Sequence, residues 1–257
     1  MKRGIYLAYG VGCYLMFFAV YAYMAGFVGN FLVPKSIDST PVESVGGAIA
    51  VDAALLLLFG IQHSVMAREG FKRAWTKLVP SAIERSTYVL VSNLAVMLLM
   101  WQWQSLPATV WNVEGAGRYV LWGLFATGWL LVPLASLMIS HFDLFGLRQV
   151  WLHWRGQEYQ SLPFHTPMLY RFVRHPLYVG WFTAFWMTPT MSAGHLLFAG
   201  ILSAYMVAAS RVEERDLVNH FGGLYEDYQQ TVPAFVPRFG RRAVLASPET
   251  GGVNSSP

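Results

Sequence analysis

Polar residues gather at both ends of one long apolar segment, and their types and spacing suit the binding of an anion. Arg174 and His175 stand directly before Pro176, and the adjacent carboxylates Glu213 and Glu214 stand just beyond the other end of the segment. A carboxylate pair this close to hydrocarbon is costly unless it has partners, and Arg174, Arg211 and Arg215 are available. The pattern predicts a site in which the two ends of the segment come together.

The chain around Pro176 is also expected to begin a helix. The residue before a proline favours an extended conformation, and proline favours the first position of a helix. The first free N–H groups, expected around Tyr178 to Gly180, would bind a carboxylate or phosphate, with Gly180 allowing close approach. Simpler interpretations stay open: the two cationic side chains extend to lipid headgroups, and the two glutamates pair within a solvated turn.

Membrane-spanning helices are the elements that must position these residues. Hydrophobic residues make up 55% of the 257-residue chain and charged residues 12%, which is too apolar for a soluble domain of this length. Apolar runs long enough to span a bilayer occupy about 5–32, 46–67, 86–107 and 118–140. The uncharged stretch 176–210 would be about 52 Å long as one helix, so it is expected to turn at 188–195 and form two helices of about 15 residues. The sequence predicts an all-α, polytopic transmembrane bundle of about six spans, the last two a short hairpin.

Positive charge is distributed unevenly between the two sides that six spans define. Lys35 and Arg118 fall on one side, and every other Lys and Arg falls on the side of both termini. By the positive-inside rule this pattern predicts an integral protein of the inner (cytoplasmic) membrane with both termini in the cytoplasm. A basic face against anionic lipid explains the net charge of +4, so no nucleic-acid partner is expected.

The rest of the chain carries fewer signals. One membrane-embedded domain is expected over 1–237, followed by a disordered cytoplasmic tail at 238–257. Cys13 is the sole cysteine, which excludes a disulfide framework and a metal site built from thiolates, and no metal site is predicted. Apolar residues at helical spacing favour an amphipathic helix at the membrane surface over 144–155.

The two polar motifs carry a resemblance to a known family. The segments "RHPLYVGW" and "EERDL...FGGLYEDYQQTVPAFVP", joined by a short apolar hairpin, closely resemble the signature of the isoprenylcysteine carboxyl methyltransferase and phospholipid methyltransferase superfamily. Its members are integral membrane enzymes that use S-adenosylmethionine, so the resemblance implies a cytoplasmic cofactor pocket in this bundle. By position it assigns cofactor contacts to Tyr170, Arg174, His175, Pro176, Tyr178, Gly180, Glu213 and Glu214, with Leu217 completing the second motif.

Segments further upstream narrow the resemblance. "QHSVMAR" at 62–68, "ERSTYVL" at 84–90 and "SHFDLFGLRQVWLHWRG" from 140 look like the bacterial methanethiol S-methyltransferases, a family that makes dimethyl sulfide, so the likeness spans about 60–238. One departure concerns 162–166, where isoprenylcysteine enzymes usually begin an H-x-L-V-T segment with histidine. Here the segment reads Leu-Pro-Phe-His-Thr and His165 comes late, which is consistent with a different substrate.

The resemblance implies methyl transfer to a small thiol, whose thiolate form is the nucleophile. An alkanethiol is mostly protonated at neutral pH, so a general base would accelerate the reaction by about 10²–10⁴-fold. The candidate catalytic residues are His141 and Asp143, at the end of the fourth predicted helix, and His63, near the end of the second. A structural hydrogen-bonding role is the alternative for each, and Asp143 could instead orient His141.

Three functions remain open from the sequence. The first is S-adenosylmethionine-dependent methylation of methanethiol at the cytoplasmic side of the membrane, with a small thiol and the lipid bilayer as partners. The second is a methyltransferase of the same fold acting on a prenylcysteine carboxylate or a phospholipid headgroup. The third is a non-enzymatic transporter or haem-binding protein, but internal duplication is not evident and the histidines cluster at one face. The oligomeric state leaves no signal in the sequence.

Overall fold

Long apolar runs fold into long helices in the computed structural model, which describes residues 2–39 and 44–237. The predicted tail at 238–257 lies outside these residues. The elements, in chain order, are α1 (Lys2–Gly29), α2 (Val45–Ala67), α3 (Glu69–Trp75), α4 (Ser81–Gln102), β1 (Thr109–Asn112), α5 (Ala116–Ile139), α6 (His141–Leu144), α7 (Leu147–Arg155), the 3₁₀ turn η1 (Met168–Arg171), α8 (Pro176–Trp186), β2 (Thr190–Ser192), α9 (Ala193–Phe221) and α10 (Gly223–Thr231).

Five of these helices are long and apolar enough to cross a membrane, namely α1, α2, α4, α5 and α9. The first four coincide with the four predicted apolar runs, although α4 begins at Ser81 rather than at 86 because its first turn is polar. The all-α membrane bundle is therefore confirmed. The surface helix expected over 144–155 is shorter, since the left-handed Gly146 (φ 85°) separates α6 from α7.

The sequence predicted a hairpin of two helices of about 15 residues each, but the two helices differ greatly in length. Helix α8 has 11 residues and is about 16 Å long, roughly half of the hydrocarbon core. Helix α9 has 29 residues, because the residues after Ser210 are good helix formers and no glycine or proline intervenes before Gly222. The glutamate pair consequently lies within α9 and not beyond the end of the hairpin.

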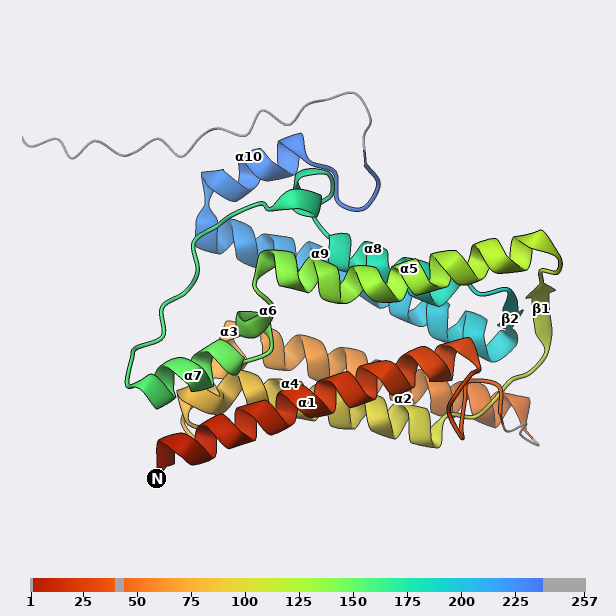
Figure 1. The fold of residues 1–257 in the computed structure, drawn as a ribbon, viewed down its shortest axis with the longest axis horizontal. Helices are drawn as coiled ribbons and strands as arrows, with labels where there is room; N and C mark the ends of the chain where they lie inside the picture. Colours follow the sequence, from red (N-terminus) through yellow and green to blue (C-terminus); the bar gives the residue numbers. More distant parts are fainter. Residues whose placement is uncertain (1, 40–43, 238–257) are drawn as a thin grey trace, which may run out of the picture.

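The long helices form two layers (Figure 1): α1, α2 and α4 make one, and α5, α8 and α9 make the other. Helices α5 and α8 approach each other closely because glycine faces the partner helix on both. A Cβ atom at Gly180 would lie 2.9 Å from Val132 Cγ2, and one at Gly128 would overlap the backbone of Ala184. Lipid tails are as apolar as these side chains, so close packing of this kind, not exclusion of water, holds such helices together.

An aromatic core fills the space between the layers. Trp103 meets Phe27 and Phe198 edge to face, with ring centroids 6.2 and 5.7 Å apart, and all three rings are fully buried. A two-stranded antiparallel sheet of β1 and β2, which the sequence did not predict, joins the layers at one end through the pairing of Thr109 with Ser192. We call this the sheet end of the bundle.

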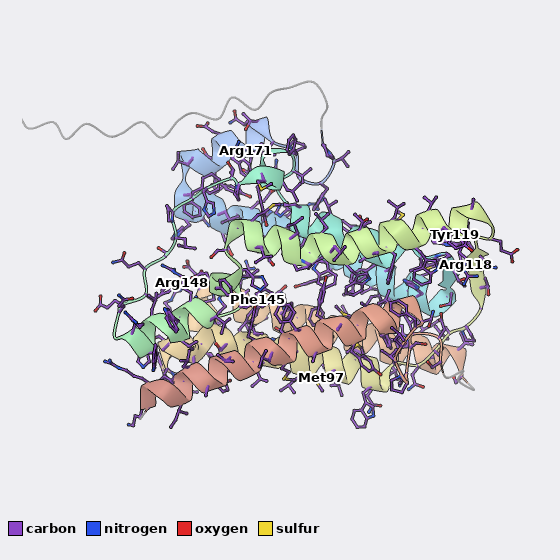
Figure 2. All side chains as sticks on the ribbon, viewed as in Figure 1. Met97, Arg118, Tyr119, Phe145, Arg148 and Arg171 are labelled. Atoms are coloured by element: carbon purple, nitrogen blue, oxygen red, sulfur yellow. The ribbon has the colours of Figure 1, made fainter. Side chains whose placement is uncertain are left out.

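The opposite end, which we call the polar end, carries the N-terminus, α3, α6, α7, η1 and α10 (Figure 1). Figure 2 shows Arg148 and Arg171 at the polar end, whereas Arg118 lies at the sheet end. Among the residues that the structure describes, the Lys and Arg side chains other than Lys35 and Arg118 belong to elements or helix termini of the polar end. The predicted one-sided charge pattern is thus present in the fold, and the cytoplasmic assignment of that side stays a prediction.

Candidate functional site

Helix α8 begins at Pro176, as predicted, with His175 in an extended conformation (φ −122°) before it. The N–H of Val179 already donates to the carbonyl of His175 at 3.1 Å, and proline has no N–H. The free N–H groups of this helix start, among the described residues, therefore belong to Leu177 and Tyr178, so the predicted range of Tyr178 to Gly180 is right for Tyr178 only. Gly180 itself faces α5, where its missing side chain permits the helix contact described above.

Glu214 brings the two polar motifs together. Its Oε1 accepts hydrogen bonds from Arg174 Nε at 2.7 Å and from His175 Nε2 at 2.9 Å, and its Oε2 accepts one from Gln229 Nε2 at 3.0 Å. The side chains of Arg174 and Glu214 are only 12% and 15% exposed. Burial makes each of these charges costly alone, so the pair is held as a unit.

The backbone after α10 completes this arrangement. The N–H groups of Arg174 and His175 donate to the carbonyls of Pro233 and Ala234 at 2.8 and 3.0 Å. The Arg174 guanidinium also donates to the carbonyls of Gln229, at 3.0 Å, and Val232. We use the name clamp for Arg174, His175, Glu214 and Gln229 together with the backbone of 232–234.

Glu213 has a different environment from its neighbour. Its Oε2 accepts a hydrogen bond from the Tyr178 hydroxyl at 2.9 Å, and no other hydrogen bond to its carboxylate is present among the described residues. The Tyr178 ring lies parallel to the His175 ring, with centroids 5.2 Å apart, and the Phe235 ring, in the segment after α10, lies 5.5 Å from the His175 ring. One carboxylate oxygen and a group of aromatic faces therefore remain available beside the clamp.

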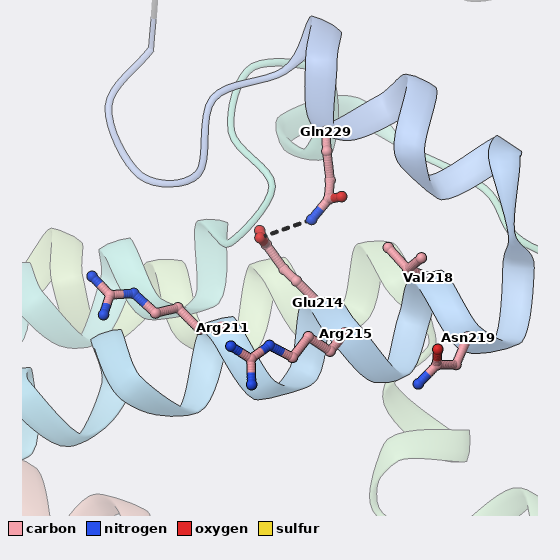
Figure 3. Close-up of a pocket in the computed structure, with 6 residues that line it drawn as sticks. All are labelled: Arg211, Glu214, Arg215, Val218, Asn219 and Gln229. Carbon is pink, nitrogen blue, oxygen red and sulfur yellow. Dashed lines mark hydrogen bonds between the residues drawn. The ribbon is translucent and has the colours of Figure 1, made fainter.

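An open pocket of about 370 Å³ adjoins the clamp between α9 and α10 (Figure 3). Figure 3 shows Gln229 reaching from α10 to Glu214, with Arg211 and Arg215 one helical turn apart on α9. Val218 and Asn219 complete the lining. The pocket thus offers two guanidinium groups and an amide to a polar ligand.

Tyr170 fixes the 3₁₀ turn before the clamp. It is buried, its hydroxyl donates to the carbonyl of Ala135 on α5, and its own carbonyl accepts from the Tyr228 hydroxyl of α10. Burial raises the pKa of Tyr170 well above its usual range, so this hydroxyl stays protonated. Tyr225 and Val232 join Tyr228 in a small apolar cluster that packs α10 onto α9.

His141 and Asp143 lie on α6, close to each other in sequence but in separate hydrogen-bond networks. His141 is 4% exposed, with Nε2 at 2.7 Å from the Tyr14 hydroxyl and Nδ1 at 2.8 Å from Ser136 Oγ. Burial lowers its pKa, so the ring is neutral at physiological pH. Asp143 forms an ion pair with Arg148 at 3.0 Å. Both ring nitrogens of His141 are thus already occupied by protein groups.

His63 lies on α2 and faces α4. Its Nε2 is 2.8 Å from the Tyr88 hydroxyl and its Nδ1 is 3.2 Å from Ser92 Oγ. Neither His63 nor Tyr88 is fully buried. The three predicted catalytic side chains therefore fall into two regions, His141 and Asp143 on α6 and His63 between α2 and α4.

Sequence reasoning did not assign several residues that the fold brings to this site. Gln229, Pro233, Ala234 and Phe235 all lie in the segment that carried the family resemblance, but nothing in a single sequence pairs them with Arg174. Tyr88, which contacts His63 and not the clamp, lies in the "ERSTYVL" segment and was likewise not assigned. Within 2–39 and 44–237, no cluster of three His, Cys, Asp or Glu side chains is placed to hold a metal ion.

Comparison with known proteins finds relatives of the same name that match most of the chain. The chain is 48% identical over 244 residues to a protein named methanethiol S-methyltransferase from Crocosphaera subtropica, covering 95% of this chain and 96% of the relative. It is 49% identical over 238 residues to a protein of the same name from Mycobacterium tuberculosis, covering 92% and 98%. Nurim from Rattus norvegicus is 33% identical over 186 residues, covering 68% and 70%. No family model and no solved structure matches the chain.

Proposed function

This chain belongs to the methanethiol S-methyltransferase family, and we propose that it methylates methanethiol to dimethyl sulfide with S-adenosylmethionine as the methyl donor. The reaction is proposed to occur at the polar end of the bundle, on the cytoplasmic side of the inner membrane, within a single domain spanning 1–237. The basic character of that end supports the orientation.

The difference between the two adjacent glutamates carries the proposal for a cofactor site. Glu214 receives three hydrogen bonds from protein groups, whereas Glu213 receives one, from Tyr178. Glu213 is exposed, so its second carboxylate oxygen is accessible to a ligand. Glu213 therefore suits the positively charged or hydroxyl groups of S-adenosylmethionine.

Other groups near the clamp fit the remaining parts of that cofactor. Arg211 and Arg215, which line the pocket, are suited to its carboxylate. The aromatic faces of Tyr178 and Phe235 are suited to a planar base or to a cation. When bound, S-adenosylmethionine supplies an electrophilic methyl group on a sulfonium centre.

The residues of this chain hold the methyl donor and the thiol in alignment. The clamp holds α10 and the 232–235 segment against the start of α8, which fixes Tyr178 and Glu213 relative to each other. Holding two reactants in a productive geometry supplies a large part of the barrier reduction in such reactions. Methanethiol is small and apolar, so it can reach this site through the bilayer, and its product can leave by the same route.

The test measures dimethyl sulfide in the headspace over membranes that contain the protein, methanethiol and S-adenosylmethionine. The unmodified chain is expected to form dimethyl sulfide. Glu213→Ala is expected to lose this activity and to lose cofactor affinity measured by isothermal titration in detergent. Glu114→Ala is the matched control, since it removes a carboxylate near the sheet end.

The other functions give different results in the same experiment. If a labelled methyl group appears on prenylcysteine or phospholipid and no dimethyl sulfide forms, the substrate is one of those molecules and not methanethiol. A Soret absorbance band in the purified protein, without methyl transfer, would identify a haem-binding protein instead. Retained cofactor affinity in Glu213→Ala would remove Glu213 from the proposed site.

A further inference from the structure

Two groups of polar side chains join α2 to its neighbours in the membrane-spanning part. His63 of α2 is bonded to Tyr88 at 2.8 Å and to Ser92 at 3.2 Å, both on α4, and the Ser64 hydroxyl lies 3.0 Å from that of Tyr205 on α9. An ionisable residue such as histidine is rare inside a bilayer and usually marks a functional site. The proposed cofactor site does not account for this cluster.

The cluster is connected to the helix that carries the glutamate pair. Arg68, at the end of α2, forms an ion pair with Asp216 of α9, three residues after Glu213. The Ser64–Tyr205 hydrogen bond likewise joins α2 to α9. His63, the residue before Ser64, therefore lies beside the junction of α2 with the helix that carries Glu213.

His141, the other histidine considered as a base, is enclosed. The Ser136 hydroxyl donates to the carbonyl of Pro133 at 2.8 Å, so it must accept its second hydrogen bond from Nδ1–H of His141. Nε2 of His141 then accepts from the Tyr14 hydroxyl. His63 has the same two kinds of hydrogen-bond partner, but it is only half-buried, whereas His141 is fully buried. The two histidines therefore differ in their accessibility to a substrate.

We propose that Tyr88 and His63 form a proton relay that deprotonates the thiol, an assignment that rests on the proposed function. In the tautomer with hydrogen on Nδ1, His63 donates to Ser92 and accepts from Tyr88 at Nε2. The thiol S–H bond breaks and its proton passes to the Tyr88 oxygen, while the phenolic proton passes to His63 Nε2. The freed sulfur electron pair forms the new S–C bond, and the electrons of the broken sulfonium C–S bond remain with the donor.

A positive charge beside the relay favours this step. Arg85 of α4 lies 5.8 Å from the centre of the Tyr88 ring. An opposite charge at this distance stabilises a thiolate that forms near the phenol.

The experiment compares two tyrosines that make the same contact with a histidine. Tyr88→Phe and His63→Gln interrupt the relay, whereas Tyr14→Phe removes the equivalent hydrogen bond to His141. Each variant is assayed with methanethiol and with a more acidic arylthiol that is ionised at neutral pH. Cofactor affinity by isothermal titration and the thermal midpoint are measured alongside, because they report folding and the cofactor site without relying on turnover.

Methylation of methanethiol at neutral pH is expected to fall by about 10²-fold or more in Tyr88→Phe and His63→Gln, and to recover at high pH where the thiol ionises unaided. The arylthiol is expected to react at nearly the unmodified rate, with unchanged cofactor affinity. An equal loss for both thiols, or a methanethiol-selective loss in Tyr14→Phe instead, would overturn the relay alone. No methylation of either thiol by the unmodified chain would overturn the proposed function, and the relay with it.

Discussion

Replacing Glu214 by alanine is expected to open the clamp while leaving the bundle folded. The substitution removes the acceptor for Arg174, His175 and Gln229 at 2.7, 2.9 and 3.0 Å. Removing one partner of a buried ion pair costs about 3–5 kcal/mol. Because the clamp lies at the polar end, where water reaches part of it, we take the lower figure of about 3 kcal/mol.

Amide hydrogen exchange measures this opening directly. The N–H groups of Arg174 and His175 are protected by the carbonyls of Pro233 and Ala234, so their exchange reports whether the 232–234 backbone is docked. A loss of about 3 kcal/mol corresponds to roughly 10²-fold faster exchange, since about 1.4 kcal/mol is a factor of ten. Amides in the middle of α5 are expected to keep their rates.

Glu213→Ala serves as the matched control for this experiment. It removes a neighbouring carboxylate that accepts one hydrogen bond from the protein, so exchange at Arg174 and His175 is expected to change by less than about tenfold. Unchanged exchange at both amides in Glu214→Ala would refute the reasoning, because Glu214 would then not hold the clamp together. Equal acceleration in the two variants would also refute it.

Three further predictions concern packing, pH and the aromatic faces. Gly128→Ala should lower the thermal midpoint, because its Cβ would overlap the backbone of Ala184, whereas Gly123→Ala, which meets open space, should keep or raise it. Burial lowers the pKa of His141 in the folded protein, so its contribution to stability should be fully present above about pH 6.5 and be lost as the pH falls below it. Thermal melts at several pH values should show a weaker pH dependence in His141→Gln. Phe235→Ala should weaken S-adenosylmethionine binding in titration with little change in the thermal midpoint, and an unchanged affinity would remove its ring from the site.

Local features of the sequence were sufficient for much of the fold. Apolar runs located four spans, and the proline after His175 located the start of α8, because both depend on neighbouring residues alone. The lengths of α8 and α9 were missed for a physical reason. A search for uncharged residues ends at Arg211, but a helix continues into charged residues that favour it and ends only at Gly222.

The clamp could be predicted only in part. A carboxylate near hydrocarbon needs a cation, so the glutamate pair was expected to meet Arg174, Arg211 or Arg215, and the structure joins Arg174 to Glu214. The other acceptors for Arg174 and His175 are backbone carbonyls of Gln229, Val232, Pro233 and Ala234. Every residue has a carbonyl, so side-chain identity carries no signal for which of them will face Arg174.

The docking of the 232–235 segment against the start of α8 has a consequence for biosynthesis. This segment follows the last long helix, so it leaves the ribosome after all the long apolar helices have been made. The bundle can therefore be inserted in the membrane while Arg174 and His175 still lack their carbonyl partners. A chain that stops before Pro233 would contain every long helix of the described residues but lack the carbonyls that bind Arg174 and His175, so the site is completed by the last described residues to be synthesised.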